Sequence, residues 1–313
     1  MKNRIRFAPP NPNGEILAEI SQRTLLGIYL LRPSERLNQI IVGVLAKAQE
    51  KYPVGIVAVS FMSNHYHLLI TCKTHKELSS FMNFFSSNLA REAGRLHGWP
   101  GRLWARRFAC IPITDEEKAQ VGRLKYILEQ GCKEGLVSSP KHWPGLNGIR
   151  EMLSGEPLKG IWVNRTAYYN ARRKKNGNPV RRIDFDEAVA LQLVPLPCWA
   201  HLSPQQYQSN IRYLVENIEE ETQSMHATEG SQVLGRRSVL RKDPLHRPGS
   251  IQSSPQPYVH AASRASREAF LAAYRFFSRA YRVAAEGFRE GDLSVNFPEG
   301  SFPPALPFVE ASK

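Results

Sequence analysis

The chain has 313 residues, of which 42 are Lys or Arg and 28 are Asp or Glu, so its formal net charge at pH 7 is +14. A basic excess of this size favours a polyanionic partner, and nucleic acid is the first candidate because neutralised phosphates release counterions. No apolar run approaches the ~18 residues of a membrane-spanning helix, and the first residues lack the apolar core of a signal peptide. Four scattered cysteines without a CxxC pair argue against a zinc ribbon and favour free thiols. We therefore expect a cytoplasmic, nucleoid-associated protein with no membrane partner.

The first 150 residues predict an alternation of strands and helices. Apolar periodicity and turn signals give a strand at 24–33, a helix at 34–51, strands at 54–62 and 65–73, a helix at 76–97, a strand at 106–114 and a helix from 115 to about 130 or 134. Ser63 and Asn64 form a two-residue hairpin connection between the second and third strands. This order is that of a ferredoxin-like split βαβ unit, an α+β fold in which helices cover one face of an antiparallel sheet. We expect one domain at 1–150.

Residues 151–313 predict a second, basic and mainly helical region, for which we expect DNA binding. Residues 164–182 contain no acidic residue, and Ser203 with Gln206 makes a capping box for a helix to about 225. The segment 230–257 has no periodicity and predicts an extended connector. Residues 263–287 predict a long amphipathic helix whose aromatic stripe is typical of packing.

The stretch FMSNHYHLLI, residues 61–70, places two histidines inside an apolar strand. Because side chains alternate along a strand, His65 and His67 point to one face and Tyr66 points to the other. Two neighbouring imidazoles form half of many divalent-metal sites. Such a pair is as often structural, so both interpretations stay open on this stretch alone.

The helix that begins near residue 115 carries candidates for the other half of such a site. Tyr126 and Gln130 are four residues apart and therefore share one helix face. A glutamine oxygen suits Mg²⁺ or Mn²⁺, and a tyrosine can attack a phosphodiester whose oxygens the metal polarises. The alternative for Tyr126 is a core tyrosine on an amphipathic helix.

In combination these residues resemble the HUH-type single-tyrosine transposases, and especially the REP-associated tyrosine transposases. HUH denotes His, hydrophobic residue, His. The positions that match the family pattern are His65, Tyr66, His67, Tyr126, Ile127, Gly135, Leu136, Val137, Trp143 and Pro144. The Asn-Pro pair of the family is replaced by Gln130 and Gly131, and several insertion-sequence members use Gln at that place as the third metal ligand. The resemblance covers residues 20 to 145.

The resemblance implies an enzyme of DNA transposition or recombination that nicks and rejoins single-stranded DNA. Tyr126 would attack a phosphodiester, giving a 5′-phosphotyrosine link and a free 3′-OH, and the reverse reaction would rejoin the strand elsewhere. Mg²⁺ or Mn²⁺ would be held by His65, His67 and Gln130 and would orient the scissile bond. The implied partner is single-stranded or hairpin DNA. Family members act as dimers in some branches and alone in others, so a homodimer stays open.

Two basic segments are candidate DNA-binding surfaces. The segment GRLWARRF supplies Arg102, Trp104, Arg106 and Arg107. The second segment, next to two tyrosines, supplies Arg172, Arg173, Lys174 and Lys175. Both combine phosphate-binding cations with aromatic rings that can stack on bases, and the alternative for both is a solvated basic face.

Three other functions compete with this hypothesis. A domesticated DNA-binding regulator would keep the fold with little catalysis, and loss of Tyr126 or of a histidine would indicate it; all three residues are present. A metal-dependent hydrolase would use water as its nucleophile and form no protein adduct. A replication initiator or relaxase usually carries a helicase domain or a third histidine in the cluster, and we find neither in the sequence.

Overall fold

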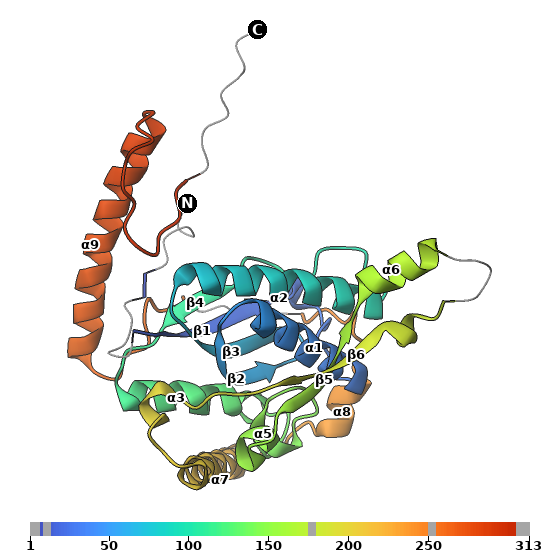
Figure 1. Ribbon diagram of the computed structural model, residues 1–313. Helices are drawn as coiled ribbons and strands as arrows, with labels where there is room; N and C mark the ends of the chain where they lie inside the picture. The colour runs from blue at the N-terminus through green and yellow to red at the C-terminus, as the bar shows by residue number, and fades with distance from the viewer. Residues whose placement is uncertain (1–6, 9–13, 175–179, 250–254, 305–313) are drawn as a thin grey trace.

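The computed structural model describes residues 7–8, 14–174, 180–249 and 255–304. Its centre is a four-stranded antiparallel sheet with the strand order β2-β3-β1-β4 (Figure 1). The strands are β1 (Ile16–Arg23), β2 (Gly55–Phe61), β3 (His65–Cys72) and β4 (Ala109–Pro112). Helix α1 (Glu35–Lys51) joins β1 to β2, and helix α2 (His75–Leu96) joins β3 to β4. This topology confirms the ferredoxin-like α+β fold and the hairpin at Ser63 and Asn64.

The first strand is β1, and the prediction of a strand at 24–33 is wrong. Ile16, Ala18 and Ile20 alternate along β1 and are buried against the helices. Residues 24–33 instead contain a short 3-10 helix, Leu25–Gly27, in which Leu26 has φ +54°. Apolar side chains of this segment enter the core although its backbone is irregular. The many apolar residues therefore indicated that the segment is buried, but not that it is a strand.

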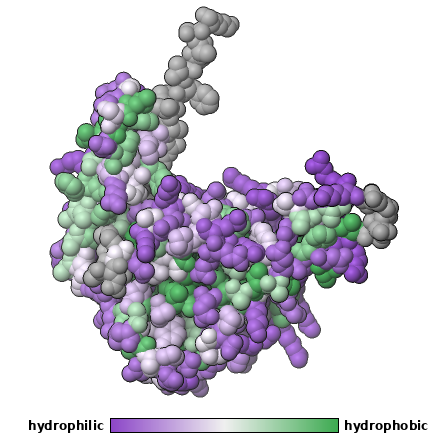
Figure 2. Space-filling view, in the orientation of Figure 1, coloured by the Kyte–Doolittle hydropathy of each residue, from purple (hydrophilic) through white to green (hydrophobic). Residues whose placement is uncertain are grey.

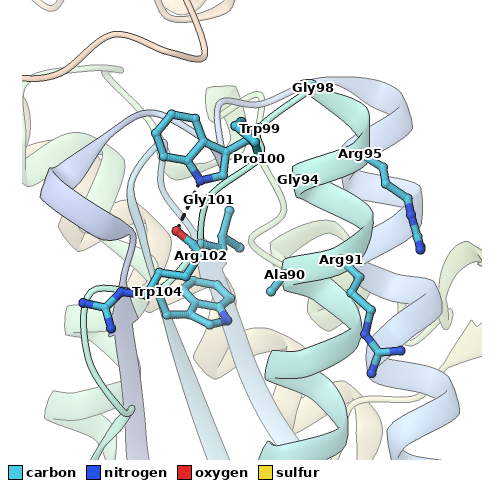
Figure 3. A pocket seen from close by; sticks show the side chains of 11 residues that line it. Ala90, Arg91, Gly94, Arg95, Gly98, Trp99, Pro100, Gly101, Arg102 and Trp104 are labelled. Atoms are coloured by element: carbon cyan, nitrogen blue, oxygen red, sulfur yellow. Dashed lines mark hydrogen bonds between the residues drawn. The ribbon is translucent and has the colours of Figure 1, made fainter.

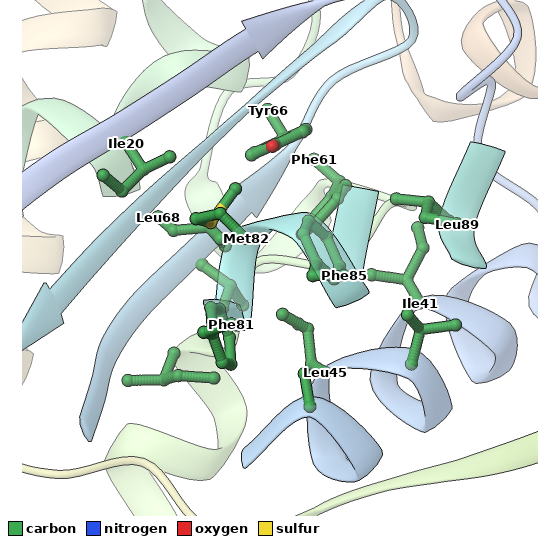
Figure 4. Packing of buried hydrophobic residues seen from close by; sticks show 14 of the residues in the cluster. Ile20, Ile41, Leu45, Phe61, Tyr66, Leu68, Phe81, Met82, Phe85 and Leu89 are labelled. Carbon is green, nitrogen blue, oxygen red and sulfur yellow. The ribbon is translucent and has the colours of Figure 1, made fainter. Parts of the chain in front are cut away.

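Helices α1 and α2 cover one face of the sheet with a close-packed apolar layer. Figure 4 shows this layer, which includes Ile20, Phe61, Tyr66 and Leu68 of the strands, Ile41 and Leu45 of α1, and Phe81, Met82, Phe85 and Leu89 of α2. Each such side chain contributes about 1.5–3 kcal/mol when it leaves water. The layer therefore fixes the central strands rigidly, and with them the residues that point to the other face.

Helix α3 (Glu117–Leu128) covers this opposite face, and α7 (Pro204–Glu229) packs against α3. Leu17, Val57 and Leu69 of the sheet pack there in one cluster with residues of both helices. Helix α3 is the added helix that the sequence predicted, but it divides at Glu129, after which the short helix α4 (Gln130–Lys133) begins. The face that carries His65 and His67 is therefore the one that α3 approaches.

The C-terminal region is mainly helical, as expected, but it also contributes a two-stranded sheet. The remaining elements are α5 (Ile149–Ser154), β5 (Leu158–Val163), α6 (Arg165–Arg173), β6 (Asp186–Leu191), α8 (Arg236–Arg241) and α9 (Arg264–Arg289). Strands β5 and β6 pack on α1, and α7 begins with the predicted capping box. Helix α8 lies within the segment predicted as an extended connector.

Helix α9 projects from the rest of the molecule (Figure 1). Apolar residues gather along it in Figure 2, and Phe276 and Val283 are exposed there.

None of the described helices is long and apolar enough to span a membrane. The four cysteines are free thiols, as the sequence indicated.

Candidate active site

Strand β3 places two histidines side by side on the face that α3 covers. The ring centroids of His65 and His67 lie 5.2 Å apart, with the two planes nearly perpendicular. The ring of Tyr126, on α3, lies 5.7 Å from the ring of His67. Gln130, at the start of α4, is buried, and its side chain lies beside His65. The structure thus brings together the four residues that the sequence predicted for the site, two from a strand and two from the helical segment that follows β4.

The break between α3 and α4 sets the position of Gln130. The Gln130 side-chain nitrogen Nε2 donates a hydrogen bond of 2.8 Å to the backbone oxygen of Tyr126. A Cβ atom on Gly131 would lie 3.2 Å from the indole of Trp143, so a small residue is needed there. Trp143 in turn donates from Nε1 to the backbone oxygen of Phe61 at 3.0 Å, which fastens the segment to β2. This bond uses only the side-chain nitrogen of Gln130, so its amide oxygen is available on the side of His65 and His67.

Glu19 of β1 is a site residue that the sequence analysis missed. It lies two positions before Ser21, the β1 partner of His67, and so points to the same face. Its Oε1 accepts a hydrogen bond of 2.7 Å from Nδ1 of His67. An acidic residue in the alternating run ILAEISQR was the available signal, but it was hidden because the first strand was placed after it.

Glu19 is 3% exposed and is surrounded by cationic or hydrogen-bonding groups. Its Oε2 lies 2.6 Å from Nη2 of Arg123 on α3 and 2.7 Å from Nε2 of His260. Burial raises the pKa of Glu19, but hydrogen bonds from His260 and His67 and the charge of Arg123 outweigh it and hold the pKa well below its usual range. Glu19 is therefore an ionised carboxylate with three partners.

The donor atoms of this cluster suit a divalent metal. An ionised carboxylate only accepts, so Nδ1–H of His67 donates to Glu19, and in the neutral form of the ring Nε2 then carries the lone pair. The Nδ1 atom of His65 is likewise engaged, at 2.7 Å from Oδ1 of Asn64. Within the part of the chain that the structure describes, no group of three or more His, Cys, Asp or Glu side chains could hold a metal. A metal here would need the oxygen of Gln130 as its third protein ligand.

The protonation state of His65 fits this role. Burial, together with the neighbouring His67 and Arg23, lowers the pKa of His65 to about 3, although the hydrogen bond with Gln130 opposes the shift. At neutral pH the His65 ring is therefore uncharged, which is the form in which imidazole binds metals.

Two cations lie against the ring of Tyr126. The guanidinium carbon of Arg123 is 3.7 Å from the ring centroid, and the Lys133 ammonium nitrogen is 4.5 Å from it. Both distances are those of cation–π contacts. The side chain of Tyr126 is only half-buried, so an approaching phosphate would meet positive charge beside the phenol.

The first predicted DNA-binding segment lies beside the sheet end that carries His65. Arg23 pairs with His65 in the β1–β3 register, and its backbone oxygen accepts from the Ala105 amide at 3.0 Å. The side chains exposed in this segment are Arg102, Arg106 and Arg107. Trp104 is held in place, because its Nε1 donates to the Ser86 oxygen at 2.9 Å.

The second predicted segment is part of α6, which adjoins the C-terminal half of α2 (Figure 1). Arg165, at the start of α6, makes two hydrogen bonds of 2.6 and 2.8 Å to the buried carboxylate of Glu92 on α2. Exposed cations of α6 and its C-cap are Arg172, Arg173 and Lys174. Lys175 lies outside the described residues. Both predicted basic segments therefore adjoin the same end of α2.

A pocket of about 550 Å³ lies between α2 and the loop that follows it. Figure 3 shows Trp99 and Trp104 on the loop side, with Arg91 and Arg95 extending from α2. Trp99 is fixed by a hydrogen bond of 3.2 Å from its Nε1 to the Arg102 oxygen. Ala90 and Gly94 of α2 face the tryptophan rings, whereas the guanidinium groups of Arg91 and Arg95 point away from them (Figure 3). Aromatic rings of this kind can stack on the bases of a single strand.

Residues 33–130, which include both histidines, Tyr126 and Gln130, match the family described as "Transposase IS200 like". No curated protein matches the chain.

Two solved structures are similar to parts of this chain. One is described as a REP-associated tyrosine transposase bound to a REP hairpin; it is 18% identical, with a TM-score of 0.41 over 49% of this chain and 86% of that one. The other, a putative transposase from Deinococcus radiodurans R1, is 17% identical, with a TM-score of 0.28 over 37% of this chain and 91% of that one. On the strength of the family match, residues 33–130 resemble the IS200-like transposases.

Proposed function

We propose that the protein is a DNA transposase that cleaves and rejoins single-stranded DNA through Tyr126. The family match supports a transposase function at the level of class. The finer mechanism rests on one observation: the ring of Tyr126 lies 5.7 Å from the ring of His67, so a potential nucleophile faces a potential metal ligand. Because the two residues come from a strand and a later helix, their proximity is a product of the fold.

The covalent step is a transesterification. The phenolic oxygen of Tyr126 attacks the scissile phosphorus, an O–P bond forms to the tyrosine, and the bond between phosphorus and the 3′ oxygen breaks. The phenol gives up its proton as it attacks and the leaving 3′ oxygen takes up one, so one DNA end is a 5′-phosphotyrosine and the other a 3′-OH. A 3′-OH of another end reverses the step, and no ATP is required because the ester bond is exchanged and not hydrolysed.

Each neighbouring residue has a role in this proposal. His65, His67 and Gln130 would hold Mg²⁺ or Mn²⁺, and when bound the metal supplies charge neutralisation at the phosphate oxygens. Glu19 fixes the tautomer and orientation of the His67 ring. Arg123 and Lys133 attract the phosphate to the phenol.

The proposed substrate is a single-stranded or hairpin DNA. The supporting observations are the net charge of +14 and the two basic segments beside α2. Exposed arginines next to aromatic rings can bind phosphates and stack on bases at the same time.

A covalent adduct tests the proposal. Purified protein is incubated with Mn²⁺ and an end-labelled single-stranded oligonucleotide that contains a hairpin, and the products are separated on a denaturing gel. We expect a labelled protein–DNA band that is absent in Tyr126→Phe and present in the matched control Tyr213→Phe, since Tyr213 is exposed on α7. Cleaved DNA without an adduct would instead identify a hydrolase that uses water, and an adduct that persists in Tyr126→Phe would exclude Tyr126 as the nucleophile.

A further inference from the structure

We infer that His260 is a positioning residue of the active site, which acts on His67 and Arg123 through the carboxylate of Glu19. The inference rests on the proposed function, because it concerns the same metal and nucleophile. His260 lies far outside residues 33–130, the part of the chain that matches the transposase family. It belongs to the segment that leads from α8 into α9.

The backbone around His260 is fastened to strand β4. His260 and Ile113 form a parallel bridge, in which the His260 amide donates to the Pro112 oxygen at 2.9 Å. The amide of Thr114 donates to the His260 oxygen, also at 2.9 Å. The side chain of His260 therefore starts from a fixed point at the edge of the sheet.

A second anchor ties the same segment to the helix that carries Tyr126. Glu116 is the N-cap residue of α3, and its Oε2 accepts from the Ala262 amide at 2.9 Å. The same oxygen accepts from the Thr114 hydroxyl at 2.7 Å. The start of α9 is thus bound to the start of α3, so the segment cannot shift relative to the catalytic helix without breaking these contacts.

The side chain of His260 completes the coordination of a buried carboxylate. Nε2 of His260 lies 2.7 Å from Oε2 of Glu19, which is also the oxygen that Arg123 contacts at 2.6 Å. The other oxygen accepts from His67. With His67 at one oxygen and both Arg123 and His260 close to the other, the carboxylate plane is held from two sides by polar contacts.

Two functional consequences follow from this geometry. The orientation of the Glu19 carboxylate sets the direction of the Nδ1–H bond of His67, and hence the direction in which its Nε2 lone pair points. Arg123 shares Oε2 with His260 and lies over the Tyr126 ring. Without His260, Glu19 is free to turn toward Arg123, so both the metal-binding nitrogen and the cation beside the nucleophile lose their fixed position.

The test measures Mn²⁺ affinity of the full-length protein without DNA, by isothermal titration calorimetry, in four variants. His260→Ala and His260→Asn both lack a donor at the Nε2 position, whereas the His260→Gln amide nitrogen reaches it. Loss of an outer partner of a metal ligand weakens binding about 10- to 100-fold, and we expect the lower limit, about tenfold, for the first two. We expect His260→Gln to bind like the wild type, as should the control His201→Ala, whose side chain is exposed.

A double-mutant cycle distinguishes action through Glu19 from a general loss of structure. The effect of His260→Asn on the Mn²⁺ dissociation constant should vanish in a Glu19→Gln background, because the residue through which it acts is gone. Thermal unfolding of the metal-free variants provides the second readout. Variants of His260 that lower the unfolding temperature but leave the Mn²⁺ dissociation constant unchanged would overturn the inference, as would equal losses in His260→Gln and His260→Asn.

Failure of the proposed function gives a different pattern. A wild-type protein that binds Mn²⁺ but forms no Tyr126 adduct would remove the nucleophile from the proposal and leave the His260 result standing. A wild-type protein that binds no Mn²⁺ would overturn the metal site and the inference together.

Discussion

Arg123 lies over the ring of Tyr126, with its guanidinium carbon 3.7 Å from the ring centroid, and its Nη2 is 2.6 Å from Oε2 of Glu19. One side chain on α3 therefore contacts both the proposed nucleophile and the carboxylate that holds His67. The metal side and the tyrosine side of the site are linked by a planar, permanently charged group. Lysine could supply the charge, but not the flat surface or the fork of donors.

Arg123→Lys should slow the formation of the DNA adduct while the protein stays folded. A cation–π contact contributes about 1 kcal/mol at a partly exposed site, so we expect roughly a fivefold lower single-turnover rate. The rate is measured by quenching the Mn²⁺ reaction with chelator at successive times. Arg212→Lys, an exposed position on α7, serves as the control, and an unchanged rate in Arg123→Lys would show that the stacking is not used.

Glu19→Gln should reduce both stability and Mn²⁺ affinity. The substitution leaves Arg123 partly buried without its counter-charge, and breaking a buried ion pair costs about 3–5 kcal/mol of unfolding free energy. Loss of a carboxylate behind a metal-binding histidine weakens metal binding about 10- to 100-fold. Urea unfolding and calorimetry measure the two effects, with Glu216→Gln, an exposed position on α7, as the matched control.

The same variant predicts a change in acid sensitivity. The pKa of Glu19 is lower in the folded protein than in the unfolded chain, where it is near 4.3. The stability that its ionised form contributes is therefore fully present above that value and is lost as the pH falls through the folded pKa. The wild type should lose more unfolding free energy than Glu19→Gln between pH 6 and pH 2, and parallel stability curves would contradict this.

Gly43→Ala should loosen the contact between α1 and the C-terminal sheet. A Cβ atom at Gly43 would lie 1.9 Å from the backbone oxygen of Ile161 in β5, so the strand would have to move away. We expect a loss of about 1–3 kcal/mol, as for other overpacked sites. Gly122→Ala is the control: a Cβ there meets nothing within 4 Å, and alanine should stabilise α3 by about 0.5–1 kcal/mol. Urea unfolding of both variants checks these opposite signs.

Replacing Arg102, Arg106 and Arg107 by alanine should weaken DNA binding and its dependence on salt. Each phosphate contact contributes about 0.7 to the slope of log affinity against log salt for a single strand, so three lost contacts reduce the slope by about 2. Fluorescence anisotropy with a hairpin oligonucleotide at several salt concentrations gives the slope. The matched triple variant exchanges Arg275, Arg279 and Arg282, which are exposed on α9, and an equal loss there would place the DNA elsewhere.

The amino-acid sequence was enough to predict the local features of the fold and the residues of the candidate metal and tyrosine site. Side-chain alternation put His65 and His67 on one face. The four-residue spacing predicted Tyr126 and Gln130 on one face of a single helix, but the helix divides between them at Glu129. The capping signals of α1 and α7 and the hairpin at Ser63 were also readable, because such signals depend only on neighbours in the chain.

Contacts between side chains that are far apart in the sequence could be found only from the tertiary structure. Arg123 of α3 and His260 of the segment before α9 lie 2.6 and 2.7 Å from the same oxygen of Glu19, which belongs to β1. No periodicity in the chain encodes that contact, because it depends on the strand order β2-β3-β1-β4 and on the bridge between Ile113 and His260. The first strand was misplaced for a related reason: the apolar residues at 24–33 are buried by the helices around them and not by a strand of their own.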